Sequence, residues 1–200
     1  MADVVDAHTH LREDPVMARL IEKHDPYVEP EWEVEFERLV VSVINQSISM
    51  AAANAVEKRV YALFDGPITP EAVLAANDTE LAEAGLGKQK TKYINNAAEA
   101  FLENDFTREG LSSHSDEAVI ETLSEIHGIG EWTARMYLLF VLEREDVLPL
   151  GDLAIRRGIE NVYNDGKELS RAEMREIAEI WRPYRSEATK YIWAEYESEE

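Results

Sequence analysis

Two glycines and one aspartate are the residues of this sequence whose types and spacing most clearly suggest chemistry. Gly128 and Gly130 lie one residue apart in the stretch EIHGIGEWTA, residues 125–134. Glycines this close together disfavour a continuous helix, so they predict a tight turn between two helices. The backbone N–H groups at the start of the second helix are then available to bind an anion.

The aspartate follows in a loop that contains proline and glycine. Asp152 belongs to the stretch LPLGDLAIRRG, residues 148–158, and lies 20 residues after Trp132. The simplest interpretation of Asp152 is an N-cap of the helix that starts after it. A carboxylate at a helix start can also stabilise a positively charged sugar while water attacks it, which is the chemistry of N-glycosidic bond cleavage. The sequence is compatible with both interpretations.

Helical periodicity runs through nearly the whole chain. Apolar residues recur at helical spacing in most segments, and strand patterns are nearly absent. The sequence therefore predicts an all-α fold of about ten helices. We expect helices at 14–24, 32–45, 47–64, 70–76, 79–84, 91–104, 115–126, 132–142, 152–163, 170–180 and 183–197.

The net charge is the most unusual property of the composition. The 200 residues include 41 acidic and 20 basic side chains, which gives a formal charge of −21. Such a charge repels nucleic acid in dilute buffer. In about 1 M salt the Debye length falls to about 3 Å, so local groups such as Lys88–Lys92 and Arg156–Arg157 decide what binds. One interpretation of the charge is a protein that avoids polyanions. The other is a protein from a high-salt cell, where acidic surfaces rich in arginine are common, and we expect an archaeal cell of this kind.

Several classes of protein are disfavoured by composition. The chain has no cysteine, which excludes disulfides and thiolate metal sites. An apolar run of about 18 residues and a signal peptide are both missing, so the expected location is the cytoplasm, with no membrane partner. His8 and His10 in VVDAHTHL resemble the metal-binding strand of amidohydrolases. That enzyme class needs a (β/α)₈ barrel of about 250 residues, so a mobile N-terminal segment is the preferred interpretation.

Five segments in order resemble the DNA glycosylase superfamily that is named after a helix-hairpin-helix followed by a Gly/Pro-rich loop and an aspartate. The segments are INQSISMAAANAVEKRV (44–60), GLGKQKTKYI (85–94), LSEIHGIGEWTA (123–134), LPLGDLAIRRG (148–158) and WRPYRSEATKYIW (181–193). The last one is similar to the closing helix of the alkylbase subgroup, the 3-methyladenine DNA glycosylase II type. The resemblance covers about residues 32–196. It implies two helical lobes around a central cleft, with a glycosylase core at 31–200 and an N-terminal helical extension at 1–30.

The resemblance also implies an activity. It points to a monofunctional enzyme that flips alkylated purines, of the 3-methyladenine and 7-methylguanine type, out of double-stranded DNA during base excision repair. Asp152 is the implied catalytic residue. Trp132 takes the place of the lysine that forms a Schiff base in members that also cut the backbone, so no lyase step is expected. Alkylated purines carry a positive charge and leave without a general acid.

Further site residues follow from the same resemblance. The implied base pocket contains Trp132, Gln46 and Tyr137. The implied DNA contacts are Ser47, Lys90, His127, Gly128, Gly130, Thr133 and Arg156. No cofactor is expected beyond a monovalent cation held by the backbone of Ser124, Ile126 and Ile129. Ile68 is a candidate for the residue that fills the gap left by the flipped base, and Tyr27, Trp32, Trp181 and Tyr184 are aromatic residues that fit core or surface support better than a pocket.

Three alternatives remain open. A glycosylase for another class of lesion has the same motifs, and a non-catalytic helix-hairpin-helix module binds DNA with the hairpin alone. An acidic helical scaffold unrelated to either is the third. Asp152 separates the first two, because a protein that only binds DNA has no use for a carboxylate facing the sugar. The expected partner is duplex DNA, bound by a monomer.

Overall fold

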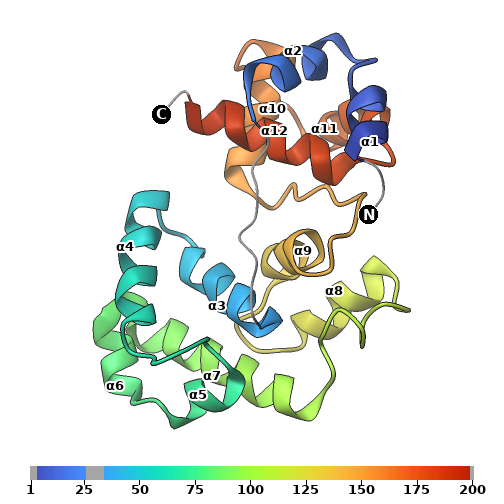
Figure 1. Ribbon diagram of the computed structural model, residues 1–200. Helices are drawn as coiled ribbons and strands as arrows, with labels where there is room; N and C mark the ends of the chain where they lie inside the picture. Colours follow the sequence, from blue (N-terminus) through green and yellow to red (C-terminus); the bar gives the residue numbers. More distant parts are fainter. Residues whose placement is uncertain (1–3, 26–33, 199–200) are drawn as a thin grey trace. The chain divides into compact units, whose positions relative to one another are not determined.

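The computed structural model describes residues 4–25 and 34–198, and every regular element in these ranges is a helix (Figure 1). The all-α prediction is therefore confirmed. The chain divides into two compact units: unit 1 combines Met1–Glu29 with Glu143–Glu200, and unit 2 is Pro30–Leu142. The central cleft that the resemblance implies stays a prediction. Within the described ranges, no helix has the length and apolar character needed to span a membrane.

Unit 1 is built from helices at both ends of the chain. These are α1 (Val4–Leu11), α2 (Pro15–Lys23), α10 (Leu153–Asn164), α11 (Arg171–Ile177), the 3-10 turn η2 (Ala178–Trp181) and α12 (Arg185–Ser198). Leu11, Met17 and Leu20 share one hydrophobic core with Ile155 and Ile192. The sequence predicted residues 1–30 as an extension, whereas α1 and α2 are part of this core because their apolar faces pack against the C-terminal helices.

The expectation of a mobile N-terminal segment is wrong for residues 4–11. In α1, Ala7 and Leu11 are buried, so the helix is anchored by its apolar side. His8 Nε2 lies 2.9 Å from Tyr191 Oη and 3.2 Å from a Glu187 carboxylate oxygen, and His10 Nε2 lies 3.0 Å from the Ile180 carbonyl oxygen. Among the described residues no group of His, Asp and Glu could hold a metal ion. Both histidines therefore dock α1.

Unit 2 contains the remaining helices. These are α3 (Glu35–Asn45), α4 (Met50–Tyr61), α5 (Pro70–Ala75), α6 (Asp78–Leu81), the π-helical turn η1 (Ala82–Leu86), α7 (Gly87–Glu103), α8 (Asp116–Ser124) and α9 (Glu131–Phe140). Helix α3 is central, since it contacts α4, α7 and α9. All of its residues from Phe36 to Ile44 are buried, and the polar ones among them include Arg38 and Ser42, which are hydrogen-bonded to each other.

Local signals account for where several helices begin. Helix α4 starts at Met50 instead of Ser47, because Ser47 has a φ of 57° and Ser49 caps the helix through its side chain. Helix α7 starts at Gly87, four residues earlier than Thr91. It follows a π-helical turn in which Gly85 has a φ of 117°. Tyr27 and Trp32, two of the candidate aromatics, lie outside the described residues.

Candidate functional site

The predicted hairpin joins α8 to α9, and its two glycines have different reasons to be glycine. Gly128 has a φ of 106°, and a Cβ there would lie 2.1 Å from Cγ of Tyr93. Gly130 has a φ of −96°, and a Cβ there would meet nothing within 4 Å. Position 128 thus requires glycine, because of its positive φ and because Tyr93 of α7 lies too close for a Cβ. At Gly130 the space around a Cβ is open.

Helix α9 begins without a side-chain cap. Its N-cap is Gly130, which has no side chain that could accept a hydrogen bond from the first turn. The first N–H groups of a helix carry the positive end of the helix dipole, so this start can accept an anion. Thr133, in the first turn, is buried, and its hydroxyl oxygen accepts a hydrogen bond from Gln46 Nε2 at 3.0 Å. Thr133 therefore contacts α3's end and not the surface.

Two side-chain amides hold the hairpin. Gln46 Nε2 also donates to the Gly128 carbonyl oxygen at 3.1 Å, and Asn96 Nδ2 donates to the His127 carbonyl oxygen at 2.9 Å. His127 is exposed, with its ring edge-on to Tyr93. Gln46 was predicted to line a base pocket, and its described contacts are with the hairpin. No pattern in the sequence indicated Asn96, because its partner lies 31 residues away.

Lys90 caps the end of α3. Its Nζ donates to the carbonyl oxygens of Ile44 at 2.7 Å and Gln46 at 2.8 Å. Removal of water around this ammonium group lowers the pKa of Lys90. The predicted DNA contact of Lys90 therefore competes with two internal hydrogen bonds that tie α7 to α3.

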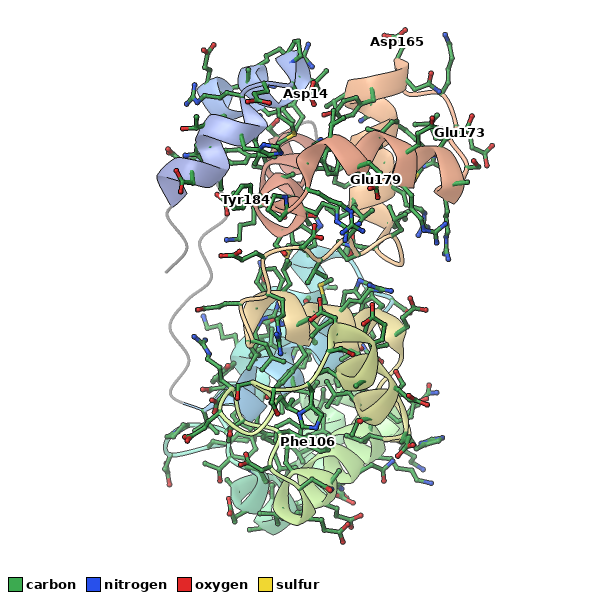
Figure 2. The ribbon with its side chains drawn as sticks, turned by 90° about the vertical axis from the view of Figure 1, so that its right-hand side faces the viewer. Asp14, Phe106, Asp165, Glu173, Glu179 and Tyr184 are labelled. Carbon is green, nitrogen blue, oxygen red and sulfur yellow. The ribbon has the colours of Figure 1, made fainter. Side chains whose placement is uncertain are left out.

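Two predicted residues occupy positions that do not fit their roles. Tyr137 is 1% exposed, and its hydroxyl donates to the Phe106 carbonyl oxygen at 2.7 Å inside unit 2, where Figure 2 labels Phe106. Burial raises the pKa of Tyr137, as expected for a core phenol and not for a pocket wall. Ile68 is fully buried, so it cannot enter a DNA helix. Both predictions fail because apolar or aromatic character alone does not distinguish core from surface.

Trp132 and Ser47 remain accessible. Trp132 is half-buried at the second position of α9, and Ser47 is exposed in the loop after α3. The apolar residues that follow are also exposed: Ile48 in the loop is 40% exposed, and Met50 at the start of α4 is 58% exposed. The positions of Trp132 and Ser47 are compatible with contacts to a ligand.

In unit 1, Asp152 is the N-cap of α10 and has a second hydrogen bond. Its Oδ1 accepts from the Ile155 N–H at 3.0 Å and from Trp193 Nε1–H at 3.3 Å. Trp193 reaches Asp152 because α12 packs closely on α10: a Cβ at Gly158 would lie 2.5 Å from Cγ2 of Ile192. The sequence indicated Asp152 but not Trp193, although the tryptophan lies in a segment that carried the resemblance.

The loop before Asp152 is held at two places. Arg156 donates to the carbonyl oxygens of Leu150 at 3.0 Å and Gly151 at 3.1 Å, so it braces the loop. Upstream, Arg185 forms an ion pair with Asp146, and Ser186 accepts from the Val147 N–H at 2.9 Å. The backbone that leads to Asp152 is therefore tied to α12 as well as to α10.

The structure brings the predicted residues together in two groups. Gln46, Lys90, His127, Gly128 and Thr133 are linked by hydrogen bonds or chain proximity in unit 2. Asp152, Arg156 and the additional Trp193 form the group of unit 1. That both groups act on one ligand stays a prediction.

The hairpin carbonyls are suitable donors for a hard cation. Ser124 ends α8, where carbonyl oxygens carry the negative end of the helix dipole. The Ile126 carbonyl oxygen accepts from the Ile129 N–H at 2.9 Å and has a second lone pair. The oxygens of Ser124, Ile126 and Ile129 are the kind of ligand that an alkali cation prefers.

Comparisons with known proteins agree with this arrangement. Residues 40–183 match the HhH-GPD superfamily of base excision DNA repair proteins. The DNA-3-methyladenine glycosylase 1 of Schizosaccharomyces pombe is 32% identical, over 88% of this chain and 74% of its own length. The DNA-3-methyladenine glycosylase of Saccharomyces cerevisiae is 34% identical, over 82% of this chain and 58% of its own.

Solved structures include one of high similarity. The S. pombe 3-methyladenine DNA glycosylase in complex with abasic DNA superposes with a TM-score of 0.86 at 29% identity, over 94% of this chain and 95% of that one. The resemblance noted from the sequence is thereby confirmed. The chain belongs to the HhH-GPD superfamily of base excision DNA repair proteins.

Proposed function

We propose that this protein is a monofunctional DNA glycosylase that excises alkylated purines from double-stranded DNA. The observation that carries the proposal is Asp152, a carboxylate held by the Ile155 N–H and by Trp193 Nε1 in a member of a base excision repair family. A helix-hairpin-helix module that only binds DNA does not need an aspartate held at this position. The names of the relatives support 3-methyladenine as the type of lesion.

The chemistry assigned to Asp152 is electrostatic. As the glycosidic bond breaks, its electron pair leaves with the purine, and the sugar becomes positively charged at C1′. The carboxylate stabilises this charge, water adds to C1′, and the water's proton is released to solvent. The two hydrogen bonds to Oδ1 fix the carboxylate before the charge develops, so it needs no reorganisation. An alkylated purine already carries a positive charge and leaves as a neutral base.

Trp132 supports a single activity. An indole has no amine with which to form a Schiff base, so the product is an intact strand with an abasic site. Its position at the half-buried start of α9 is compatible with stacking on an electron-poor base. Borohydride reduction of a reacting mixture should trap no covalent protein–DNA complex, and any trapped complex would contradict this part of the proposal.

The distribution of acidic residues supports DNA as the partner. One residue in five is acidic, yet residues 39–56 and 84–98 contain no aspartate or glutamate, and residues 147–159 contain only Asp152. The first two segments meet the hairpin through Gln46, Tyr93 and Asn96. The lack of acidic side chains on these segments lowers the local repulsion of a phosphate backbone in a chain of net charge −21, and Glu131, at the hairpin itself, is paired with Arg135.

Since Ile68 is buried, another residue must fill the gap that the flipped base leaves in the DNA, and the loop after α3 contains a candidate. Ile48 is exposed and apolar, follows the left-handed Ser47, and precedes the cap of α4. Apolar side chains of this kind separate base steps in bent DNA. We assign the insertion to Ile48, with Met50 beside it.

The acidic surface supports a high-salt origin. A monomer in the cytoplasm of a high-salt archaeal cell would bind DNA where charges are screened beyond about 3 Å. A monovalent cation held by the carbonyls of Ser124, Ile126 and Ile129 would add positive charge beside a phosphate on the hairpin. No other cofactor is assigned.

One assay tests the proposal. Duplex DNA treated with a methylating agent should release free 3-methyladenine and 7-methylguanine in the presence of the protein, measured at low and at molar salt. If the protein released bases only from duplexes that contain oxidised or mismatched bases, it would be a glycosylase for another lesion class. If the protein bound DNA tightly but released no base from any of these duplexes, the remaining interpretation would be a non-catalytic DNA-binding module.

A further inference from the structure

Helix α7 contacts the hairpin directly through Tyr93 and Asn96, and indirectly through Lys90, which binds the backbone of Gln46; the three residues are spaced three apart. Lys90 Nζ holds the carbonyl oxygen of Gln46, the Tyr93 ring packs against Gly128, and Asn96 Nδ2 holds the carbonyl oxygen of His127. Residues with this spacing lie on neighbouring turns of one helix side. One face of α7 therefore supports the hairpin. Its contact with Gln46 extends this support, because the Gln46 side chain binds the Gly128 carbonyl oxygen.

The two amides hold consecutive carbonyl groups from two directions. Asn96 holds the carbonyl oxygen of His127, and Gln46 holds that of Gly128. In a trans peptide the C=O and the following N–H point in opposite directions. Asn96 therefore turns the Gly128 N–H away from α7. Gln46 turns the Ile129 N–H toward the Ile126 carbonyl oxygen, which accepts it at 2.9 Å.

We propose that Gln46 and Asn96 act as a clamp that fixes the direction of the hairpin N–H groups before a DNA phosphate binds. The inference rests on the proposed function only in taking a phosphate as the ligand. Gln46 and Asn96 are positioning residues, because neither needs to touch DNA. A hairpin whose peptide planes are already fixed loses less conformational freedom on binding, so the clamp raises affinity without adding a contact.

The test uses shape-preserving variants and a matched control. Gln46→Met and Asn96→Leu remove the amide donors but keep similar side-chain volumes. Asn95→Leu is the control, because Asn95 is the neighbouring residue of α7 and its Nδ2 binds Asp78 at 2.9 Å, not the hairpin. The probe is a duplex with a tetrahydrofuran abasic site, which cannot undergo excision.

We expect each clamp variant to raise Kd for this duplex about tenfold, with the control within about twofold. The slope of log Kd against log salt concentration should be smaller by about one in the clamp variants, as expected when one phosphate contact is lost. In ¹⁵N spectra, DNA should shift the Gly128 and Gly130 amide resonances of the wild type, and should shift them less in the variants. The rate at saturating methylated DNA should change less than Kd.

Several results would overturn the clamp. An unchanged Kd in folded clamp variants is one, and an equal loss in Asn95→Leu is another. Should Asn96→Leu fail to fold, Asn96→Ala removes the donor without adding a charge. Hairpin amides of the wild type that do not move on adding DNA overturn the inference without any variant. Because these readouts measure binding alone, a wild type that binds but releases no base would refute the proposed function and leave the clamp standing.

Discussion

Helices α9 and α10 follow each other in the chain and begin in opposite ways. Helix α9 begins after Gly130, with no side-chain cap. Helix α10 begins after Asp152, whose carboxylate accepts the Ile155 N–H. Both starts carry the same partial positive charge from the backbone. At the start of α10 an internal carboxylate is the partner of this charge, whereas at the start of α9 Gly130 has no side chain that could be one.

The difference assigns separate tasks to the two helix starts. The start of α9 suits a phosphate, because Gly130 carries no side chain and a Cβ there would meet nothing within 4 Å. The start of α10 suits a sugar that becomes positive, because the Asp152 carboxylate is oriented by two hydrogen bonds. A protein with only the first arrangement binds DNA, and one with both has the means to break a glycosidic bond.

The largest effect is expected for Asp152→Asn. Asparagine is as good an N-cap as aspartate, so the free energy of unfolding should change by less than about 1 kcal/mol. The charge is lost, so base release from methylated DNA should fall by about 10³-fold or more, while Kd for abasic DNA stays within about tenfold.

A second capping aspartate provides the control for that variant. Asp14 caps α2 in the same unit, accepts the Val16 N–H at 3.0 Å and is labelled in Figure 2. Asp14→Asn should leave base release unchanged. If Asp152→Asn released bases near the wild-type rate, Asp152 would be only an N-cap of α10. The two helix starts would then not differ in function.

The glycines of the hairpin should separate folding from binding. Gly130→Val has room for its side chain and an ordinary φ, so the fold should persist while Kd for all DNA sequences rises about tenfold or more. Gly128→Ala combines a positive φ with a clash against Tyr93 and should lower the free energy of unfolding by about 3 kcal/mol. Thermal unfolding and DNA titration of both variants measure this. Binding that survives Gly130→Val would make the hairpin purely structural.

A smaller effect is expected for Trp193→Phe. Phenylalanine keeps most of the apolar contact but removes the N–H that reaches Asp152, so base release at saturating DNA should fall about tenfold with Kd unchanged. Trp181→Phe is the control, because its Nε1 donates to Tyr163 Oη in the same unit. If the two variants reduce release equally, the bond to Asp152 contributes nothing specific.

The smallest change is expected with salt. Most DNA-binding proteins lose affinity by about 10³-fold or more between dilute and moderate salt, because binding releases counterions. Here the surface carries −21, and its repulsion of DNA is screened as salt rises. Base release should therefore hold or rise from dilute buffer to molar potassium chloride. A steep decline would show that Lys88, Lys92 and Arg157 dominate, and would remove the support for a high-salt origin.

Local sequence was sufficient where a residue's role depends on its neighbours in the chain. The hairpin between α8 and α9 was predicted from two glycines, and the start of α10 from Asp152 after Gly151. Helix ends differ from the prediction where a φ or a cap intervened, as at Ser47 and Ser49. A helical extension at 1–30 was predicted, but helix α1 was not placed within it, and its anchoring was missed because its apolar positions pack on helices from the other end of the chain.

Long-range packing decided contacts that the sequence did not indicate. Lys90 was predicted to contact DNA, and its Nζ also caps α3, so the DNA contact stays a prediction. Tyr137 had the character of a pocket aromatic, yet it lies in the core beside Phe101. Neither outcome is encoded within one helix turn, because burial depends on which helix face meets a neighbour.

The sequence by itself determined the all-helical fold class, the hairpin and the capping aspartate, since each arises from backbone preferences over a few residues. Only the tertiary structure decided what holds these groups in place. Trp193 reaches Asp152 across 41 residues because Gly158 lets α12 approach α10, and Asn96 reaches the hairpin across 31 residues because Tyr93 packs under Gly128. Such hydrogen bonds depend on distances between helices, which are set by packing and not by local periodicity.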